Sequence, residues 1–494
     1  MLLVLPWLSP YTAGPVPNAW PWLTCAFCVA VLWLLRRLIN AELTAATWVL
    51  AATISAAIGL LQYFGLAHAF GPWISLTNPG EAFSNLRQRN QFATLTSIGL
   101  VALLGLLALR GCGRRVPGWA YLTMVLLALG NAASSSRTGL FQWLLILLLA
   151  GWWARPALLG QWRLGVFAVQ ALLTYGVAVL TLPWLLTEMI GLTSGGLFGR
   201  LAEAPGCGNR RVLWANVWML IAEKPWLGWG WGELDFAHFQ TLYPNERFCD
   251  ILDNAHNLPL HLAVELGLPI AMLFFACLGW LVCRAKPWAE TNPTRQLAWG
   301  VLAVMGLHSL VEYPLWYGPF QMAAALSVWL LWVMPARNDR PAGKSQRGED
   351  HIRNWPVPPV LAVSGATILI VTLLFAAWDY WRVSQLYLPQ AERAMAYRDD
   401  TLDKVRNSWL FQDQVQFAEL TTTPLTAVNA AQLNAMAKQL LHFSPEPRVV
   451  EKLIESAVML GRNDEALFYL QRFQVAFPQE HARWKKESTR HETP

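Results

Sequence analysis

The sequence predicts an all-α polytopic membrane protein with about 11 transmembrane helices, a large external loop and a small external α-helical C-terminal domain. Of its 494 residues 55% are hydrophobic and only 14% are charged, whereas soluble domains average about 25% charged residues. Apolar runs long enough to cross a bilayer recur along the chain, and basic residues occupy every second loop between them. The net charge of +6 therefore reflects topology and does not indicate nucleic-acid binding.

Apolar segments are expected near residues 1–9, 19–35, 45–64, 91–109, 118–133, 139–154, 164–187, 258–283, 296–313, 318–335 and 357–378. The first lacks a basic region and a convincing cleavage site, so it is interpreted as a short spanning segment rather than a signal peptide. Many of the 28 Trp residues lie near segment ends, where an amphipathic indole suits the headgroup layer.

The positive-inside rule assigns the orientation. The cytoplasmic loops carry Arg36 and Arg37; Arg110, Arg114 and Arg115; Arg155 and Arg163; Arg284, Lys286 and Arg295; and a basic group from Arg337 to Arg353. Loops 10–18, 65–90, 134–138, 188–257 and 314–317 are then external, which means periplasmic in a bacterial inner membrane. The predicted domains are an N-terminal transmembrane bundle (1–187), a large periplasmic loop (188–257), C-terminal transmembrane helices (258–378) and a periplasmic helical domain (379–494).

Past the last apolar segment the composition becomes that of a soluble domain. One helix is predicted from Pro447 to Leu460, and a second from Asn463, as its cap, to Ala476. This hairpin resembles a single tetratricopeptide-type unit, although that assignment normally rests on repetition of the unit.

Cysteine positions fit an oxidising external compartment. Five of the seven cysteines lie in apolar segments or on the cytoplasmic side, whereas Cys207 and Cys249 lie in the large external loop. A disulfide between these two would tie the ends of the loop together. Two unrelated buried thiols are the alternative, because the sequence does not show the geometry that a disulfide needs.

Two polar clusters occur where external loops enter spanning segments. The first holds donor-rich side chains that suit a phosphate or a sugar: Arg87, Arg89, Asn90 and Gln91. Its alternative interpretation is a basic helix cap near lipid headgroups. The second, Ser134-Ser-Ser-Arg-Thr-Gly, carries Arg137 and is either an anion ligand or a polar turn with a helix N-cap.

The large loop holds a third cluster at the start of a predicted amphipathic helix. Arg210 and Arg211 open it, and guanidinium groups at a helix N-terminus suit a diphosphate. Trp214, Val217, Trp218 and Ile221 follow at helical spacing, so we expect the helix to lie on the membrane surface or across a groove. Contact with lipid headgroups is the alternative for the arginines.

The loop ends in Asp253-Asn-Ala-His256-Asn257, where polar neighbours could orient the imidazole as a general base. A capped structural histidine is the alternative. His261 and Glu265 follow one turn deeper, and their spacing from His256 is poor for a metal site, so no metal or other cofactor is expected. His308 and Glu312 end a later segment, where a buried carboxylate marks a site or serves packing.

Motifs in the loop resemble those of the O-antigen ligase and polymerase superfamily of bacterial glycan transferases. They are Arg-x-x-Leu-Trp from Arg210, Lys-Pro-Trp-Leu-Gly-Trp-Gly from Lys224, and Ala-His-Asn around His256. Three further features resemble the PglL-type protein O-oligosaccharyltransferases. These are Asn85-Leu-Arg-Gln-Arg-Asn-Gln, His308-Ser-Leu-Val-Glu-Tyr-Pro-Leu and the helical C-terminal domain.

The resemblance implies a metal-independent, inverting transferase of the GT-C type. It would move an oligosaccharide from undecaprenyl diphosphate to a hydroxyl of a periplasmic, pilin-like protein. His256 matches the essential loop histidine, Arg210 the loop arginine near the diphosphate, and Arg87 the external arginine before the fourth helix. Arg89 departs from the pattern, which has Pro or a neutral residue at that position.

Several alternatives remain open at the level of sequence. A ligase acting on lipid A-core, or a repeat-unit polymerase, would differ only in the acceptor. A transporter of lipid-linked glycans would need polar residues at mid-membrane depth and on both sides, whereas these polar clusters are external. A structural scaffold would not need Arg and His so concentrated.

Overall fold

The computed structural model describes residues 1–10, 14–35, 39–111, 116–154, 161–193, 196–197, 199, 206–333 and 358–491. Part of the predicted topology lies outside these residues: Arg36, Arg37, Arg114, Arg115, Arg155, the basic group from Arg337 to Arg353, and some of the large loop. Within the described ranges the secondary structure is helical, without a β-strand. The predicted all-α fold class is therefore confirmed for this part of the chain.

The chain divides into two compact units. Unit 1 comprises residues 1–12, 18–203 and 279–373, and unit 2 comprises residues 13–17, 204–278 and 374–494. The helices of unit 1 are α1 (Leu5–Leu8), α2 (Ala19–Leu34), α3 (Ala41–Tyr63), α4 (Arg89–Leu109), α5 (Gly118–Ala133), α6 (Arg137–Trp153), α7 (Gln161–Ile190), α13 (Pro293–Ser309) and α14 (Gly318–Val333).

The helices of unit 2 are α9 (Arg210–Glu223), α10 (Leu234–Gln240), α11 (Leu258–Leu266), α16 (Thr401–Val405), α17 (Gln412–Thr422), α18 (Ala430–Leu440), α19 (Pro447–Met459), α20 (Asn463–Ala476) and α21 (Pro478–His491). Two further helices, α12 (Leu268–Ala285) and α15 (Pro359–Ser384), continue from one unit into the other. Short 3₁₀ turns include η3 (Ser84–Leu86) and η5 (Pro314–Trp316).

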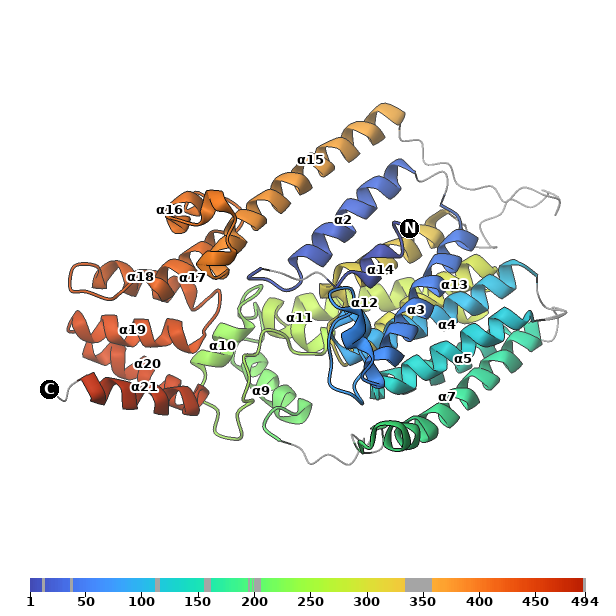
Figure 1. Ribbon diagram of the computed structural model, residues 1–494, viewed down its shortest axis with the longest axis horizontal. Helices are drawn as coiled ribbons and strands as arrows, with labels where there is room; N and C mark the ends of the chain where they lie inside the picture. Colours follow the sequence, from blue (N-terminus) through green and yellow to red (C-terminus); the bar gives the residue numbers. More distant parts are fainter. Residues whose placement is uncertain are drawn as a thin grey trace. The chain divides into compact units, whose positions relative to one another are not determined.

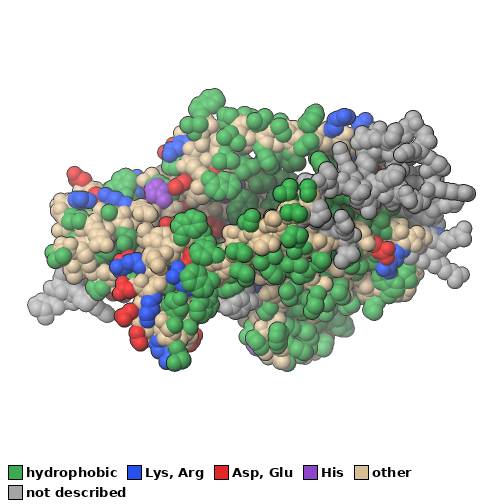
Figure 2. All heavy atoms as spheres, turned by 90° about the horizontal axis from the view of Figure 1, so that it is seen from above, with side chains coloured by type: hydrophobic (Ala, Val, Ile, Leu, Met, Phe, Trp, Pro, Cys, Tyr) green, Lys and Arg blue, Asp and Glu red, His purple; other side chains and the backbone are tan. Residues whose placement is uncertain are grey.

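Five helices in the described ranges are long and apolar enough to cross a membrane: Ala41–Tyr63, Arg89–Leu109, Arg163–Ile190, Leu268–Ala289 and Val360–Tyr387. Ala19–Leu34, Gly118–Ala133 and Gly318–Val333 are apolar but shorter. Hydrophobic side chains are exposed over much of the face seen in Figure 2, as lipid-facing surface requires, whereas charged ones gather over the C-terminal helices. The chain is thus a membrane protein, and the count of 11 spans remains a prediction.

One predicted segment is wrong as a single helix. Residues 258–283 divide into α11 and α12 at Gly267, whose φ of +85° cannot belong to an α-helix. The first predicted segment, residues 1–9, contains only the single turn of α1, with Trp7 buried edge-on against Phe320. One turn rises only about 6 Å, far less than a bilayer.

The centre of unit 1 is α4, which contacts α3, α5, α6 and α13 and is buried along most of its length (Figure 1). Polar side chains on its buried faces pair with those neighbours. The Thr94 hydroxyl lies 2.9 Å from His308 Nδ1 of α13 and accepts a 2.8 Å hydrogen bond from Gln142 of α6. Asn131 of α5 donates to Thr96 at 2.8 Å and to the Ala93 carbonyl at 3.1 Å. These bonds specify how the four helices align.

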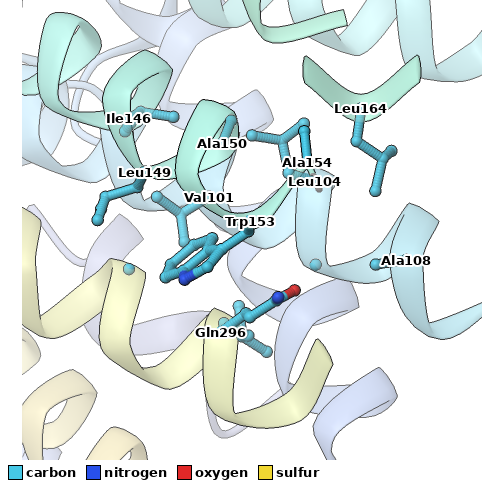
Figure 3. Close-up of a pocket in the computed structure, with 13 residues that line it drawn as sticks. Val101, Leu104, Ala108, Ile146, Leu149, Ala150, Trp153, Ala154, Leu164 and Gln296 are labelled. Carbon is cyan, nitrogen blue, oxygen red and sulfur yellow. The ribbon is translucent and has the colours of Figure 1, made fainter. Parts of the chain in front are cut away.

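An apolar cavity of about 50 Å³ lies toward the C-terminal ends of α4 and α6 and the N-terminal end of α13 (Figure 3). Its walls include Val101, Leu104, Ile146, Trp153, Leu297 and the single polar residue Gln296. None of its lining residues is titratable, so the cavity offers packing space and no chemistry.

Unit 2 has separate clusters of buried side chains. One joins α9 and α11 through Val217, Leu220 and Val264, and another fills the C-terminal helices around Leu453 and Phe473. Helices α19 and α20 occupy the residues of the predicted hairpin. Asn463 is the first residue of α20 and not its cap, because the chain enters the helix one residue earlier, at Arg462.

The close approach of Gly139 in α6 to Asn131 of α5 and Ala93 of α4 predicts the effect of one methyl group. A Cβ at Gly139 would lie 2.3 Å from Asn131 Oδ1 and 3.0 Å from Ala93 Cβ. Gly139→Ala should therefore destabilise the fold by about 1–3 kcal/mol through overpacking, seen as a lower thermal unfolding temperature in detergent. Gly151→Ala in the same helix is the control, since nothing lies within 4 Å of that position. Equal unfolding temperatures for the two variants would contradict this packing.

Candidate functional site

Polar groups meet at one end of unit 1, where α4 and α6 begin and α13 ends. Asn90 links these elements because its amide donates to Glu312 Oε1 at 3.0 Å and its carbonyl oxygen accepts from the Ser136 hydroxyl at 2.7 Å. Glu312 is buried. Three loops predicted to be external therefore lie at the same end of the unit. Two sequence candidates, Asn90 and Glu312, are brought into direct contact.

Buried amides hold the loop that precedes α4. Gln62 Nε2 donates to the carbonyls of Ser75 and Ser84, and its Oε1 accepts from Ser84 N at 2.6 Å. Asn85 donates to the carbonyls of Leu8 and Trp73. These bonds define the path of the chain into Arg87.

Two arginines of unit 1 are exposed close to the starts of long helices. Arg87 lies two residues before α4 and has a left-handed φ of +60°, which a non-glycine residue adopts at some cost. Arg137 is the first residue of α6, whose N-cap Ser136 accepts from Gly139 N at 3.2 Å. Because Asn90 and Ser136 are hydrogen-bonded, the positive ends of α4 and α6 are neighbours. This end of unit 1 suits an anion.

Arg89 and Gln91 of this cluster contact other side chains of unit 1. Arg89 forms an ion pair with Glu81, so part of its charge is already compensated. Gln91 is buried beside Tyr317. Arg87 and Arg137 are the more exposed arginines of this end of unit 1.

In unit 2, α9 begins at Arg210 as the sequence indicates. Asn209 caps it by accepting from Arg211 N at 2.7 Å and Val212 N at 3.2 Å. Arg210 is half-buried and Arg211 exposed. Of the two placements expected for the stripe, the membrane surface is wrong for most of α9. Val217 and Ile221 are buried in the core that α9 shares with α11, and Trp218 is exposed.

A disulfide joins Cys207, three residues before α9, to Cys249, with a Cα–Cα distance of 5.5 Å. The bridge brings the start of α9 beside the segment that leads to His256. Because oxidising compartments favour disulfides, this geometry fits an external loop.

His256 has a left-handed φ of +49°. Two contacts hold that turn: Asn254 Oδ1 accepts from His256 N at 2.9 Å, and the Trp214 indole donates to the Ala255 carbonyl at 3.0 Å. Asn257 caps α11 by accepting from Leu260 N at 3.0 Å. Strained backbone of this kind is concentrated at functional sites.

Buried titratable groups surround this turn. Burial, with the charge of His256, lowers the pKa of His261 to about 4, so its imidazole is neutral at pH 7. His261 Nε2 lies 3.6 Å from Glu265, whose pKa burial raises to about 7. Burial also raises the pKa of Asp253, an effect that the charge of His256 opposes. His256 thus lies near buried acidic and imidazole side chains.

Sequence reasoning missed several residues that position this site. Gln62 and Gln142 hold the loops and helices of unit 1. The sequence pattern places Trp214 in an apolar stripe, whereas its indole holds the turn before His256. A polar side chain inside an apolar segment was the available signal for both glutamines. Asp235 was also missed; burial together with Asp253 and Glu233 raises its pKa to about 7. It lines a pocket of about 10 Å³ with His238 and Arg247, too small for a sugar.

The described residues contain no group of three or more His, Cys, Asp or Glu side chains arranged for a metal ion. The chemistry available is anion binding at the N-termini of α4, α6 and α9, and proton exchange at His256.

Family models match three parts of the chain. Residues 82–107 match the model described as protein glycosylation ligase, residues 122–275 the O-antigen ligase model, and residues 296–491 the C-terminal model of virulence factor membrane-bound polymerases. The predicted resemblance is confirmed. Arg87 lies in the first matched region, and Arg210 and His256 lie in the second.

Two curated proteins of Acinetobacter baylyi are similar to the chain. A general O-oligosaccharyltransferase is 22% identical over 345 residues, which is 68% of this chain and 56% of that protein. A ComP-specific O-oligosaccharyltransferase is 24% identical over 282 residues, which is 55% of this chain and 48% of that protein. The chain thus spans about half the length of the curated relatives it matches. No solved structure matches it.

The turn at His256 predicts a stabilising role for Asn254. Asn254→Ala leaves the His256 N–H without this acceptor, which should cost about 1–3 kcal/mol and lower the thermal unfolding temperature. Asn254→Ser is the matched variant, because a serine hydroxyl can accept from the N–H two residues on, and it should recover part of the loss. Equal stability of Asn254→Ala and the unmodified protein would remove Asn254 from this role.

Proposed function

We propose that this protein transfers a preassembled oligosaccharide en bloc from undecaprenyl diphosphate to Ser or Thr hydroxyls of periplasmic proteins such as pilin. The observation that carries the proposal is the strained turn at His256, within residues that match the O-antigen ligase model. The names of both curated relatives, which are O-oligosaccharyltransferases, favour a protein as the acceptor. The acceptor and the donor lipid are parts of the proposal.

The proposed leaving group is the lipid diphosphate, which gains negative charge as the glycosidic bond breaks. Arginines offer it paired N–H donors, and helix N-termini add favourable potential. Arg87 and Arg137 supply this charge in unit 1, and Arg210 and Arg211 in unit 2. Arg89 contributes less, because it forms an ion pair with Glu81.

His256 is the proposed base. Its imidazole takes the proton of the acceptor hydroxyl while the hydroxyl oxygen attacks the anomeric carbon. The bond from that carbon to the diphosphate breaks on the opposite face, so the configuration inverts. Asp253 stabilises the imidazolium that results, in agreement with the effect of the His256 charge on the pKa of the Asp253 carboxyl. No metal is assigned, because the guanidinium groups compensate the diphosphate.

The proposed location is the bacterial inner membrane, with the reaction on the periplasmic side. The distribution of basic loops and the Cys207–Cys249 disulfide both support this orientation. A ligase acting on lipid A-core, or a polymerase, is the second candidate, because residues 122–275 and 296–491 match models with those descriptions.

The base role predicts the behaviour of His256→Asn. Asparagine tolerates the left-handed conformation, so the variant should keep its unfolding temperature while losing transfer by about 100-fold or more. The measurement is the intact mass of a periplasmic pilin co-expressed with this protein and a lipid-linked glycan pathway. Normal glycosylation with His256→Asn would exclude the base role. A glycan ladder on lipopolysaccharide, with unmodified pilin, would favour the ligase.

The diphosphate role predicts different outcomes for two arginines near the start of α4. Arg87→Lys keeps the charge but loses the paired donors, so the KM for the lipid-linked donor should rise about tenfold. Arg89→Gln is the matched control and should change KM less, because Glu81 compensates Arg89. Donor saturation curves in proteoliposomes give both values. A larger effect at Arg89 would reassign the phosphate contact.

A further inference from the structure

The segment Lys-Pro-Trp-Leu-Gly-Trp-Gly (224–230) forms a turn that is bonded to the junction between α11 and α12. Leu268 N donates to the Pro225 carbonyl at 2.9 Å, Trp229 N to the Val264 carbonyl at 2.8 Å, and Gly230 N to the Glu265 carbonyl at 3.0 Å. The turn and the junction therefore form one backbone-bonded element, which we call the aromatic turn (residues 224–230).

Glycines permit this close approach. A Cβ at Gly228 would lie 2.3 Å from the Glu265 carbonyl oxygen, and a Cβ at Gly267 would lie 2.2 Å from that of Trp226. Both residues also have left-handed φ values, +70° and +85°. The obstructing atoms are backbone, which cannot swing away as a flexible side chain can. The aromatic turn is thus held rigidly at the head of α12.

This arrangement leaves two large apolar side chains in the open. Trp226 is 74% exposed and Leu227 is 84% exposed, although the backbone beside them is tightly bonded. Immediately after the junction, α12 exposes Ile270, Met272, Leu273 and Phe274. Only about 6% of the apolar part of the candidate span Leu268–Ala289 is buried inside the protein. Trp226 and Leu227, which form the exposed tip of the aromatic turn, are therefore continuous with a surface suited to lipid.

We infer that the aromatic turn is a membrane anchor whose Trp226 and Leu227 insert into the interfacial layer of the leaflet where α12 begins. Indole rings favour that layer, because it accommodates both their apolar body and their N–H group. The Lys224 ammonium lies 3.7 Å from the Trp229 ring centre, where it adds positive charge beside the turn for lipid phosphates. The partner is a bilayer containing anionic lipid.

The anchor has a structural consequence for unit 2. The aromatic turn is bonded to the C-terminal end of α11, and His256 precedes the N-terminal end of the same nine-residue helix. Nine residues of α-helix span about 14 Å. Anchoring the turn therefore limits the distance between His256 and the bilayer interface. This limit holds whatever reaction the protein catalyses.

The test is photocrosslinking of the full chain in nanodiscs of phosphatidylethanolamine and phosphatidylglycerol. Benzoylphenylalanine replaces Leu227 in one sample and Val428 in the control. Val428 is 96% exposed and lies in the turn between α17 and α18 of the same unit. Intact mass should show about tenfold more lipid adduct at position 227 than at position 428, because the interface favours aromatic side chains. An equal yield at both positions, or none at 227, would overturn the anchor. A crosslink from 227 to another protein chain would make the tip a protein-docking surface instead.

A second comparison tests the glycine contact. In the chain labelled at position 227, Gly267→Ala should displace the tip and lower the yield of lipid adduct severalfold. Gly279→Ala in α12 should leave the yield unchanged, since nothing lies within 4 Å of that position. If Gly267→Ala does not fold, the comparison of positions 227 and 428 still decides the proposal. An unchanged yield in a folded Gly267→Ala chain would contradict the rigid turn.

Discussion

The requirement that polar groups inside a bilayer find partners within the protein determines the organisation of unit 1. Thr94 and Asn131 lie in apolar helices that the membrane would not solvate, and each is hydrogen-bonded to a neighbouring helix. Shifting one helix by a turn would leave these groups unpaired, at a cost of several kcal/mol each. The helix alignment that pairs Thr94 and Asn131 also brings Asn90 into hydrogen-bonding contact with Ser136 and Glu312. The basic end of unit 1 is thus a consequence of pairing deeper in the bundle.

Unit 2 reaches its geometry by different means. Its candidate residues follow turns. Side-chain caps and glycine contacts position them, whereas buried polar pairs between long helices do so in unit 1. Asn209 caps α9 and Asn257 caps α11. Asn254 holds the turn at His256, just before α11. Each cap satisfies backbone N–H groups that would otherwise be exposed at a helix start. The disulfide adds a covalent limit near the start of α9.

The two units therefore divide the chemistry of the proposed transferase. Unit 1 offers cationic groups and helix N-termini, and unit 2 offers an imidazole among buried carboxyl groups together with further arginines. The family models do not follow this division: the protein glycosylation ligase match lies in unit 1, whereas the O-antigen ligase match runs from unit 1 into unit 2 and includes His256.

The sequence by itself determined the helices, because the length and periodicity of an apolar segment are local properties that do not depend on the rest of the fold. It also indicated Arg87, Arg210 and His256, since charged groups in an apolar chain stand out and motifs are linear. It did not indicate the division of residues 258–283, where a single glycine joins two helices. Nor could it assign Gln62, Trp214 or Asn254 their hydrogen-bond partners. Those roles were decided by tertiary structure, because a hydrogen bond between distant residues depends on how helices align, and no local pattern encodes that alignment.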